Sequence, residues 1–547
     1  MKIKIIFCAL AVILGLCVYF CGLGDYGLID PDEGRYSEIP REMIESGDFI
    51  TPRLNYVKYF EKPVLYYWLT AGVFKMFGQN EFTSRLTPVL SGLLTCLITG
   101  ILAFKITRSK KSAWLAGLML GSSFLWFACS RLNIIDITFS LFFTLSLFSF
   151  RYWLEDLTRK FWLNVFYIFM ALAVLSKGLA GVVLPGGIAV IYAVLSGQAK
   201  DILTKIFSPV AIIIFFVINA VWFAPVMIKN PDFFNFFFIH EHFLRYTTTI
   251  HKHEEAVYFF IPVMLGAVVP FTGLVFDALR AVAGKYDFIS KHDGIFLGTW
   301  LLLPVIFFSF SGSKLVTYIL PSVPPLIILS AGILANINQK IFKHVMILNT
   351  LLILPLALTG LILPLISNDE SIKAMAAPIF AFGLSLLVFY IVSFKLLKAN
   401  LHVAFLLCLI AFIGLYVASP VFKSRAAFLS QKDTAEIIQR EINLTSNSED
   451  VKIIAFQKLL QGMNFYLARR TITADILDEL EFGATVENER EQNNGWFINT
   501  QELQKLWSSQ NRVVAVARAN NSERISEILS NPVRKFITSA DVIYMNF

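Results

Sequence analysis

The sequence predicts a polytopic α-helical membrane protein that ends in a small soluble domain of helices and strands. The first observation is composition: 56% of the 547 residues are hydrophobic, 16% are charged, and the mean hydropathy is +0.65. A soluble globule could not bury that much apolar surface. The second is that apolar stretches near the ~20 residues needed to cross a bilayer recur along the chain. The third is that this pattern stops near residue 422.

The apolar stretches number about thirteen, and each must be helical because the hydrocarbon core offers its backbone polar groups no water to bind. They lie near residues 5–23, 84–105, 112–129, 134–150, 161–176, 178–196, 207–228, 257–278, 294–311, 315–335, 343–366, 375–394 and 400–421. Residues 1–422 are therefore predicted to form the transmembrane domain.

The short loops between the stretches show a charge bias that orients the chain. Lysine and arginine gather on one side, for example as Lys110 and Lys111 in one loop and as Arg159 and Lys160 in another. By the positive-inside rule that side is cytoplasmic. An odd number of spans then places the C-terminus outside. The net charge of +8 serves this topology, so no nucleic-acid partner is expected.

Three longer segments fall on the outer side: loops over about 24–83 and 229–256, and the tail 423–547. The tail alternates strand-like runs with helix-like runs, which predicts a small α/β domain. The strand-like runs are 451–456, 512–517 and 542–545, and the helix-like runs are 434–442, 501–507 and 522–529. Because other loops are short, chemistry is expected in these three segments.

The first outer loop carries the densest set of polar residues. Pro31 favours the start of a helix whose first turn holds Asp32 and Glu33, where the helix dipole stabilises carboxylates. This structural role alone would account for both acids. Arg35, however, lies three residues after Asp32, so the two side chains share one helical face.

Arg35 also begins an acid–base stripe along this helix. Glu38 and Glu42 follow at spacings of three and four residues, which again favours a single face. A solvated surface helix would show the same stripe. A second acid–base pair, Glu61 and Lys62, follows in the same loop, and this favours a functional site on the outer side.

Ionisable residues near the outer ends of predicted spans form a second group of candidates. Asp136 lies about one turn inside its span, where a carboxylate has little reach to water, so a role at a cavity floor is as well supported as packing. Arg131 is expected to extend to the interface. Lys177 and Lys314 are further cations on this side. Tyr318 follows Lys314 by one turn, and hydrogen bonding or interfacial packing explains it equally well.

Several motifs together make the chain resemble a known family, the bacterial lipid A aminoarabinose transferases, which belong to the protein-mannosyltransferase-like branch of the GT-C glycosyltransferases. Each motif alone is weak, whereas the combination is specific and extends over most of the chain. The motifs are Pro31-Asp-Glu-Gly-Arg-Tyr-Ser-Glu, Glu42-Met-Ile-Glu-Ser-Gly-Asp, Tyr59-Phe-Glu-Lys-Pro, Ser176-Lys-Gly, Glu241-His-Phe-Leu-Arg and Ser311-Gly-Ser-Lys-Leu-Val-Thr-Tyr-Ile-Leu-Pro. The resemblance implies a GT-C fold with a cavity that opens to the periplasm.

The resemblance also implies roles for residues that match these motifs. Asp32 is the expected catalytic carboxylate, and Arg35 and Lys62 are further expected catalytic residues. Asp136 is added to this set because of its position inside its span, not because of a motif. The expected substrate contacts are Glu33, Tyr36, Tyr59, Lys177, Arg245, Lys314 and Tyr318. The chemistry fits these residue types independently, because displacing a polyprenyl phosphate requires cations that stabilise the departing negative charge.

A metal site is a further candidate. Four of the seven histidines fall within fourteen residues, at 240, 242, 251 and 253, and imidazole with carboxylate suits zinc or a similar divalent ion. The alternative is a solvent-exposed or hydrogen-bonded interfacial loop. By resemblance, His242 would pair with Glu61 at such a site. The resemblance implies no nucleotide cofactor, because the donor is lipid-linked.

The expected function is transfer of an amino sugar, such as 4-amino-4-deoxy-L-arabinose, from undecaprenyl phosphate to lipid A phosphate at the periplasmic face of the bacterial inner membrane. Added positive charge would reduce binding of cationic antimicrobial peptides. The alternatives are a protein O-mannosyltransferase-like enzyme that uses a polyprenyl-phosphate hexose, and a transporter. A transporter should concentrate polar residues near the bilayer midplane, often in two related halves, and the sequence shows no such repeat.

Overall fold

The structure is a computed structural model that describes residues 2–244, 255–396, 401–444, 450–486, 489 and 491–547. Its contacts divide the chain into two units. The helical unit comprises Met1–Cys21, Glu61–Tyr66 and Thr87–Val421. The mixed unit comprises Gly22–Phe60, Tyr67–Leu86 and Phe422–Phe547. Most of the first outer loop thus groups with the tail in the mixed unit, and the predicted domain boundary at 422/423 stays a prediction.

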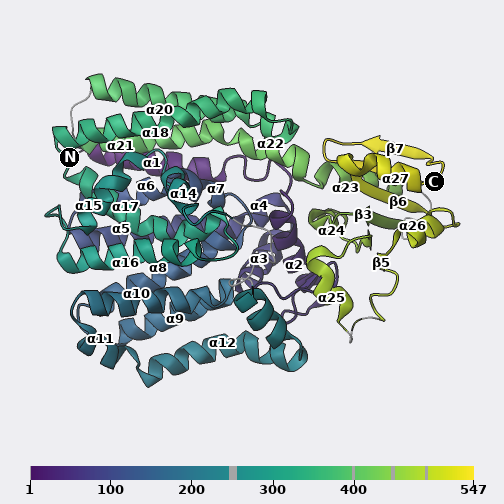
Figure 1. Ribbon diagram of the computed structural model, residues 1–547, viewed down its shortest axis with the longest axis horizontal. Helices are drawn as coiled ribbons and strands as arrows, with labels where there is room; N and C mark the ends of the chain where they lie inside the picture. Colours follow the sequence, from purple (N-terminus) through teal and green to yellow (C-terminus); the bar gives the residue numbers. More distant parts are fainter. Residues whose placement is uncertain (1, 245–254, 397–400, 445–449, 487–488, 490) are drawn as a thin grey trace. The chain divides into compact units, whose positions relative to one another are not determined.

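The helical unit is built from helices that overlie every predicted apolar stretch (Figure 1). They are α1 (Lys2–Phe20), α5 (Leu86–Thr107), α6 (Lys110–Gly121), α7 (Phe124–Ser130), α8 (Ile135–Trp153), α9 (Lys160–Lys177), α10 (Ala180–Leu195), α11 (Ala199–Ile206), α12 (Pro209–Lys229), η1 (Asn235–Leu244), α14 (Phe260–Ala267), η2 (Thr272–Leu274), α15 (Val275–Val282), α16 (Lys291–Ser309), η3 (Val316–Ser322), α17 (Val323–Ala335), α18 (Gln339–Ile366), α19 (Glu370–Lys373), α20 (Ala376–Leu396) and α21 (Leu401–Ala418). The next helix, α22 (Pro420–Leu429), belongs to the mixed unit from Phe422 onward.

Eight helices in the described part of the chain are long and apolar enough to cross a membrane, or up to ten if each of two bent pairs is one span. The bends are 60° between α6 and α7, and 119° between α14 and the segment Thr272–Val282. The polytopic helical class is confirmed. The number of spans, about thirteen, stays a prediction. The apolar parts of α1 and α10 are shorter than those of the eight helices, and α8 contains the charged residues Asp136 and Arg151.

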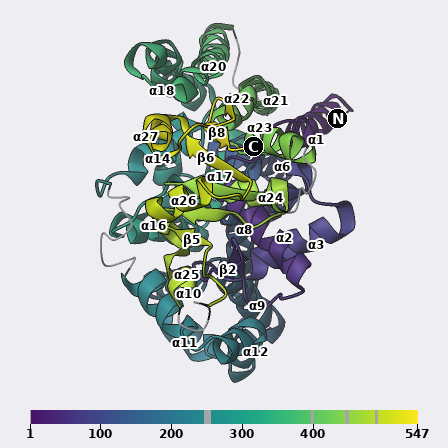
Figure 2. The same ribbon diagram turned by 90° about the vertical axis from the view of Figure 1, so that its right-hand side faces the viewer.

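Close helix packing in this unit depends on small residues. Helices α18 and α20 lie side by side in both views (Figure 1; Figure 2). A Cβ atom added at Gly360 would lie 2.5 Å from the backbone nitrogen of Phe380, and one added at Gly383 would lie 2.6 Å from the Cα of Ala357. The two backbones can approach this closely only because neither glycine has a side chain.

The mixed unit contains a six-stranded sheet with the order β5-β4-β3-β6-β8-β7. Its strands are β3 (Lys452–Phe456), β4 (Ile472–Ala474), β5 (Phe497–Ile498), β6 (Val513–Arg518), β7 (Arg534–Ile537) and β8 (Asp541–Met545). β5, β4, β3 and β6 are parallel, whereas β8 is antiparallel to both β6 and β7. The α/β class predicted for the tail is confirmed, and its three predicted strands correspond to β3, β6 and β8.

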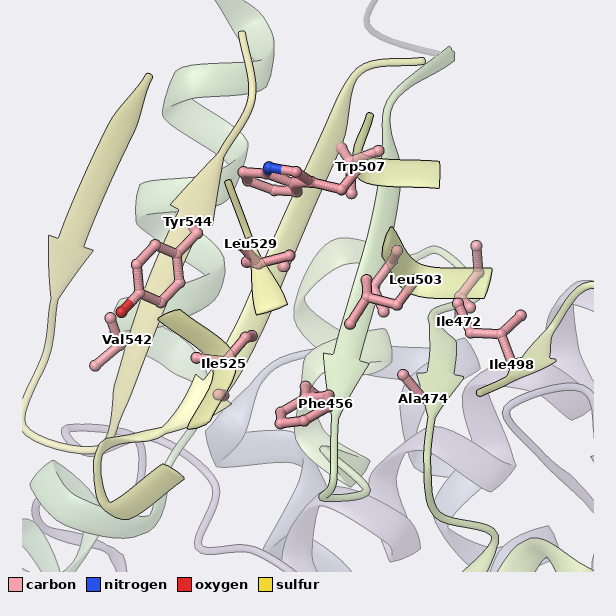
Figure 3. Packing of buried hydrophobic residues seen from close by; sticks show 14 residues of the cluster. Phe456, Ile472, Ala474, Ile498, Leu503, Trp507, Ile525, Leu529, Val542 and Tyr544 are labelled. Carbon is pink, nitrogen blue, oxygen red and sulfur yellow. The ribbon is translucent and has the colours of Figure 1, made fainter. Parts of the chain in front are cut away.

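Helices cover both faces of this sheet because its central strands are apolar on both sides. On one face, Phe456 and its neighbours pack with Leu503 and Trp507 of α26 (Thr500–Trp507) and Ile525 of α27 (Ser522–Ile528), as Figure 3 shows. On the other face, Ile453 and Ala455 pack with residues of α23 (Lys432–Asn443) and α24 (Gln461–Leu467). The remaining short helices are η5 (Asp478–Leu480), α25 (Glu481–Thr485) and η7 (Ala519–Asn521).

The first outer loop supplies α2 (Asp32–Ser46), a hairpin of β1 (Arg53–Leu54) and β2 (Val57–Lys58), α3 (Leu65–Phe77) and α4 (Glu81–Ser84). The hairpin turn places Asn55 and Tyr56 at φ of 53° and 64°, as a two-residue turn requires. The Glu42 carboxylate accepts the backbone N–H of Tyr56 at 3.0 Å, and the Asn55 amide donates to the Thr471 carbonyl at 2.9 Å. These bonds fix the residue that follows the hairpin, Tyr59.

Candidate active site

Helix α2 begins where Pro31 predicts, with Asp32 and Glu33 in its first turn. Consecutive helical residues point about 100° apart, and the structure separates the two acids accordingly. The Asp32 side chain is half exposed, at 51%. The Glu33 side chain is buried. Only Asp32 therefore remains open to a substrate from the solvent side.

Glu33 is held by a buried cation. Its carboxylate accepts two hydrogen bonds from the Arg85 guanidinium, at 2.8 and 2.7 Å. Arg85 also donates to the carbonyls of Leu23, Tyr26 and Gly27, and lies 3.8 Å from the ring centroid of Tyr26. These contacts tie the start of the outer loop to α2. A direct contact between Glu33 and the substrate stays a prediction.

This pairing changes what we expect of Glu33→Gln. From sequence the variant is milder than Asp32→Asn, since only Asp32 shares a face with Arg35. In the structure, neutralising Glu33 leaves the fully buried Arg85 without its carboxylate, which costs about 3–5 kcal/mol in stability. We expect a lower Tm and lower expression, with near-normal turnover per folded molecule. Thermal unfolding of the purified variant checks this, and an unchanged Tm would contradict the pairing's structural role.

Arg35 is the centre of a polar cluster in the mixed unit. It forms ion pairs with Asp32 and Glu479, and its Nη1 donates to the Tyr59 hydroxyl at 2.9 Å. Its Cζ lies 5.0 Å from the ring centroid of Tyr36. The buried Nε has no acceptor among the described residues. Burial alone would lower the pKa of Arg35, but Glu479 and the other neighbours raise it above its usual value, so Arg35 stays a cation.

The structure brings together four residues that the sequence predicted for one site: Asp32, Arg35, Tyr36 and Tyr59. It also adds two that sequence reasoning missed. The Gln461 amide donates to Glu479 Oε1 at 2.7 Å, and the Tyr59 hydroxyl donates to Glu479 Oε2 at 3.3 Å. These residues lie more than 400 positions from Arg35, in the tail, and no local pattern there distinguishes them from other polar residues.

The rest of the predicted stripe has a structural role. Arg41 donates to both carboxylate oxygens of Glu38, at 2.6 and 2.7 Å, and both residues are buried. Burial raises the pKa of the Glu38 carboxyl, against the opposing effect of Arg41, and raises that of Glu42 well above its usual range. Glu42 holds the hairpin turn at Tyr56. This part of the helix therefore secures the hairpin.

A second polar cluster lies in the helical unit. Asp136 is in the first turn of α8 and Lys177 is the last residue of α9, and they form an ion pair. The Lys177 Nζ lies 4.6 Å from the ring centroid of Tyr318 in η3. Both charged side chains are less than one-fifth exposed. The three residues are far apart in sequence, and the structure brings them together. Their roles stay predictions.

The other predicted cations in this unit have different surroundings. Lys314 is buried and donates to the carbonyls of Ser311 and Glu255, each at 2.9 Å. Arg131 does not extend to an interface, so that expectation is wrong. It is 1% exposed and donates to the Val18 and Tyr19 carbonyls, at 2.5 and 3.1 Å. A cation at the C-terminal end of α1 complements the helix dipole there.

Glu61 and Lys62 lie near one another, with 3.8 Å between Lys62 Nζ and Glu61 Oε2. The Lys62 ammonium also donates to the Glu61 carbonyl at 3.0 Å. Over the described residues, no group of three or more His, Cys, Asp and Glu side chains is placed to hold a metal ion. The side chain of His242 and all of Arg245 lie outside the described residues, as do His251 and His253. The Glu61–His242 pairing stays a prediction.

Asp30, just before α2, is a further buried acid that sequence reasoning missed. Its carboxylate accepts the Gly462 N–H at 3.0 Å. Burial raises the pKa of Asp30 to about 7, against the opposing effects of Arg518 and Lys458, and Asp541 raises it further. Since the folded state then binds the proton more tightly than the unfolded chain, this group's contribution to stability falls as pH rises from about 4 to about 7.

We therefore expect Asp30→Asn to raise the Tm more at pH 8 than at pH 5, because the amide mimics the protonated acid and removes the unfavourable charge. Thermal unfolding of the full-length protein at both pH values measures this. Asp25→Asn is the matched control, since Asp25 is an exposed acid of the same loop. An equal Tm change at both pH values would contradict the buried-charge account of Asp30.

Comparisons with known proteins agree with this architecture. A family model described as "Dolichyl-phosphate-mannose-protein mannosyltransferase" matches residues 4–244, and one described as "Aminoarabinose transferase C-terminal domain" matches residues 438–543. An undecaprenyl phosphate-alpha-4-amino-4-deoxy-L-arabinose arabinosyl transferase from Serratia proteamaculans is 33% identical over 350 residues, 62% of each chain. One from Proteus mirabilis is 33% identical over 59% of each chain. The alignments span about three-fifths of these relatives' length.

Solved structures extend the likeness to the whole chain. ArnT from Cupriavidus metallidurans bound to undecaprenyl phosphate superposes with a TM-score of 0.86 at 27% identity, over 98% of both chains. An archaeal oligosaccharyltransferase, AglB from Archaeoglobus fulgidus, shares the fold alone, with a TM-score of 0.51 at 14% identity over 95% of this chain and 70% of that one. The protein is a GT-C-type integral membrane protein. Within that class, the chain is similar to the aminoarabinose transferases in its C-terminal family match, in these relatives and in its fold.

Proposed function

We propose that this protein is a glycosyltransferase that moves 4-amino-4-deoxy-L-arabinose, or a similar amino sugar, from undecaprenyl phosphate to a phosphate of lipid A. The observation that carries this proposal is the full-length likeness to ArnT bound to undecaprenyl phosphate. The names of the similar arabinosyl transferases support the same donor. The proposed place of reaction is the periplasmic face of the inner membrane, which the positive-inside rule supports.

In the proposed reaction, an oxygen of the acceptor phosphate attacks the anomeric carbon. The bond between that carbon and the donor phosphate oxygen breaks, and undecaprenyl phosphate leaves with the electron pair. Because a phosphate oxygen is already a nucleophile near neutral pH, Asp32 orients the acceptor or stabilises the oxocarbenium-like centre. With a hydroxyl acceptor, as in a protein O-mannosyltransferase, Asp32 would act as a general base.

The cations have a complementary role. Arg35 offers a planar fork that suits phosphate oxygens, while Lys62 and Lys177 are movable point charges. Their partial burial strengthens their attraction for a departing phosphate. Asp136 orients Lys177 through their ion pair. Tyr59 and Tyr318 each contact one of these cations and keep it in place.

Lipid A from cells tests the proposal. A deletion strain should lack lipid A species that carry an added amino sugar, and should bind cationic antimicrobial peptides more strongly because the outer surface loses positive charge. Mass spectrometry of lipid A from the deletion strain and its parent measures this. An unchanged lipid A profile under all growth conditions would contradict the proposed acceptor.

A divalent metal on Glu61 and His242 is the finer part of the proposal. Glu61 is little exposed, and its carboxylate lies 3.8 Å from the Lys62 ammonium, with which a metal would compete. Purified protein should then contain near-stoichiometric metal, and His242→Ala should lose it. Elemental analysis checks both statements. Absence of metal, together with activity that chelators leave unchanged, would make the histidine loop an ordinary interfacial segment.

A further inference from the structure

A polar depression of about 780 Å³ lies in the mixed unit, at the end of the sheet where β3, β4, β5 and β6 begin. These strands are mutually parallel, so their amino ends meet at one edge. The lining residues either begin these strands or lie in the segments that lead into them. They are Asp450, Val451, Lys452, Ile453, Arg470, Ile472, Asn494, Gly495, Trp496, Gln510, Asn511 and Arg512.

The depression is separate from the candidate active site. Asp30 bonds to Gly462, which follows the carboxyl end of β3, and Arg35 pairs with Glu479, which follows the carboxyl end of β4. The depression is at the opposite ends of the same strands. Five residues of β3 separate the two edges, which is roughly 13 Å at the usual rise of an extended strand.

Arg470 is the most informative residue of the lining. Its guanidinium lies 4.4 Å from the ring centroid of Trp496, and Nη2 donates to the Asn493 amide oxygen at 2.8 Å. Its buried Nε has no acceptor, and it forms no ion pair within the described part of the chain. Burial lowers the pKa of Arg470 to about 10, so it remains a cation at neutral pH without a carboxylate partner.

Two acids raise the pKa of Arg470, Glu42 and then Glu489, and both are already engaged. The Glu42 carboxylate accepts the Tyr56 N–H at 3.0 Å. Glu489 pairs with Arg53 at 2.7 Å and lies 3.7 Å from Lys58. Lys452, the first residue of β3, also lines the depression and forms no ion pair among the described residues. Three cations and one acid line the site, so its charge suits an anion.

The remaining lining groups narrow the class of anion. Asn494, Gln510 and Asn511 are exposed amides that both donate and accept hydrogen bonds, as sugar hydroxyls do. Gly495 has a φ of 80°, which favours glycine, and this turn places Asn494 and Trp496 on the same rim. The volume lies in the range of small-molecule sites. A phosphate ion alone could accept from the amide N–H groups but would leave the amide carbonyl oxygens largely without donors, whereas sugar hydroxyls satisfy both.

We propose that this depression binds an acidic saccharide, a sugar that carries phosphate or carboxylate. Lys452 and Arg470 bind the anionic group, and the amides bind the hydroxyls. If the proposed function holds, such a saccharide is part of the lipid acceptor's headgroup region. The depression would then capture the acceptor through sugars that do not react.

Ligand-observed NMR titration of the full-length protein in detergent tests the site without any measurement of activity. The probe is N-acetylglucosamine 1-phosphate, compared with N-acetylglucosamine and with inorganic phosphate. We expect the sugar phosphate to bind at least ~10-fold more tightly than either part. Lys452→Gln and Arg470→Gln should each weaken binding by ~10-fold, since each removes a charge-assisted hydrogen bond. Lys505→Gln, an exposed cation of α26, should leave binding unchanged.

Two results would overturn the proposal. Inorganic phosphate that binds as tightly as the sugar phosphate would exclude a saccharide site. Binding that survives Lys452→Gln and Arg470→Gln but disappears in Arg35→Gln would assign the ligand to the candidate active site. Thermal unfolding confirms that each variant is folded, and Lys452→Gln keeps the test decisive if Arg470→Gln is unstable. Neither outcome depends on whether the wild-type protein transfers a sugar.

Discussion

Asp32→Asn should lower sugar transfer by ~10²-fold or more while leaving the Tm nearly unchanged. The carboxylate is half exposed, so its loss leaves no buried cavity and no buried polar group without solvent. Its carboxylate, however, lies beside Arg35 and remains accessible to a substrate from the solvent. Transfer to lipid A, assayed at matched expression, measures the loss. Asp25→Asn, in the same loop, should retain full activity.

A capping role makes a different prediction for the same residue. Asp32 and Glu33 both lie in the first turn of α2, where each would stabilise the helix dipole by roughly 0.3–1 kcal/mol. If helix capping were the only role of Asp32, neutralising it would lower the Tm slightly and leave turnover unchanged. Full activity in Asp32→Asn would therefore contradict the catalytic assignment.

The second large effect is expected at Arg35 and Glu479. Arg35→Gln should lower turnover by ~10²-fold, because it removes the cation at the centre of the polar cluster, which is proposed to stabilise the departing phosphate. Glu479→Gln should cost ~10-fold, since Glu479 positions the guanidinium and the Tyr59 hydroxyl. Glu481→Gln is the matched control: this acid is exposed, lies two residues away and loses the same charge.

A double-mutant cycle separates positioning from an independent role. If Glu479 acts through Arg35, the double variant should be no slower than Arg35→Gln alone. If the two losses multiply instead, Glu479 does not act through Arg35. A Glu479→Asp variant should recover part of the activity, because a carboxylate is kept at a shorter reach.

The fold was largely predictable because its signals are local. Apolar stretches of membrane length predict helices wherever they occur, and α2 begins at Asp32 because Pro31 precedes it. The strands β3, β6 and β8 follow from short runs of β-branched and small apolar residues. The hairpin of β1 and β2 was missed, since its strands have two residues each and its turn lacks glycine.

The site was predictable only in part, because a helical period indicates a face but not what covers that face. The spacing correctly placed Asp32 beside Arg35, yet it could not show that Arg85 covers Glu33 or that Arg41 covers Glu38. Partners from distant sequence, such as Glu479, carry no local signal. Arg131 was mistaken for an interfacial cation because its sequence neighbours do not show that it binds the carbonyls at the end of α1.

The most direct test of the central claim uses purified full-length protein, isotopically labelled aminoarabinose on undecaprenyl phosphate, and either lipid A or a peptide as acceptor. We expect lipid A to gain the labelled sugar on a phosphate, undecaprenyl phosphate to be released in equal amount, and Asp32→Asn to abolish most of both. Mass spectrometry measures all three. Transfer to the peptide with none to lipid A, or lipid A that stays unmodified in the presence of active donor, would contradict the account.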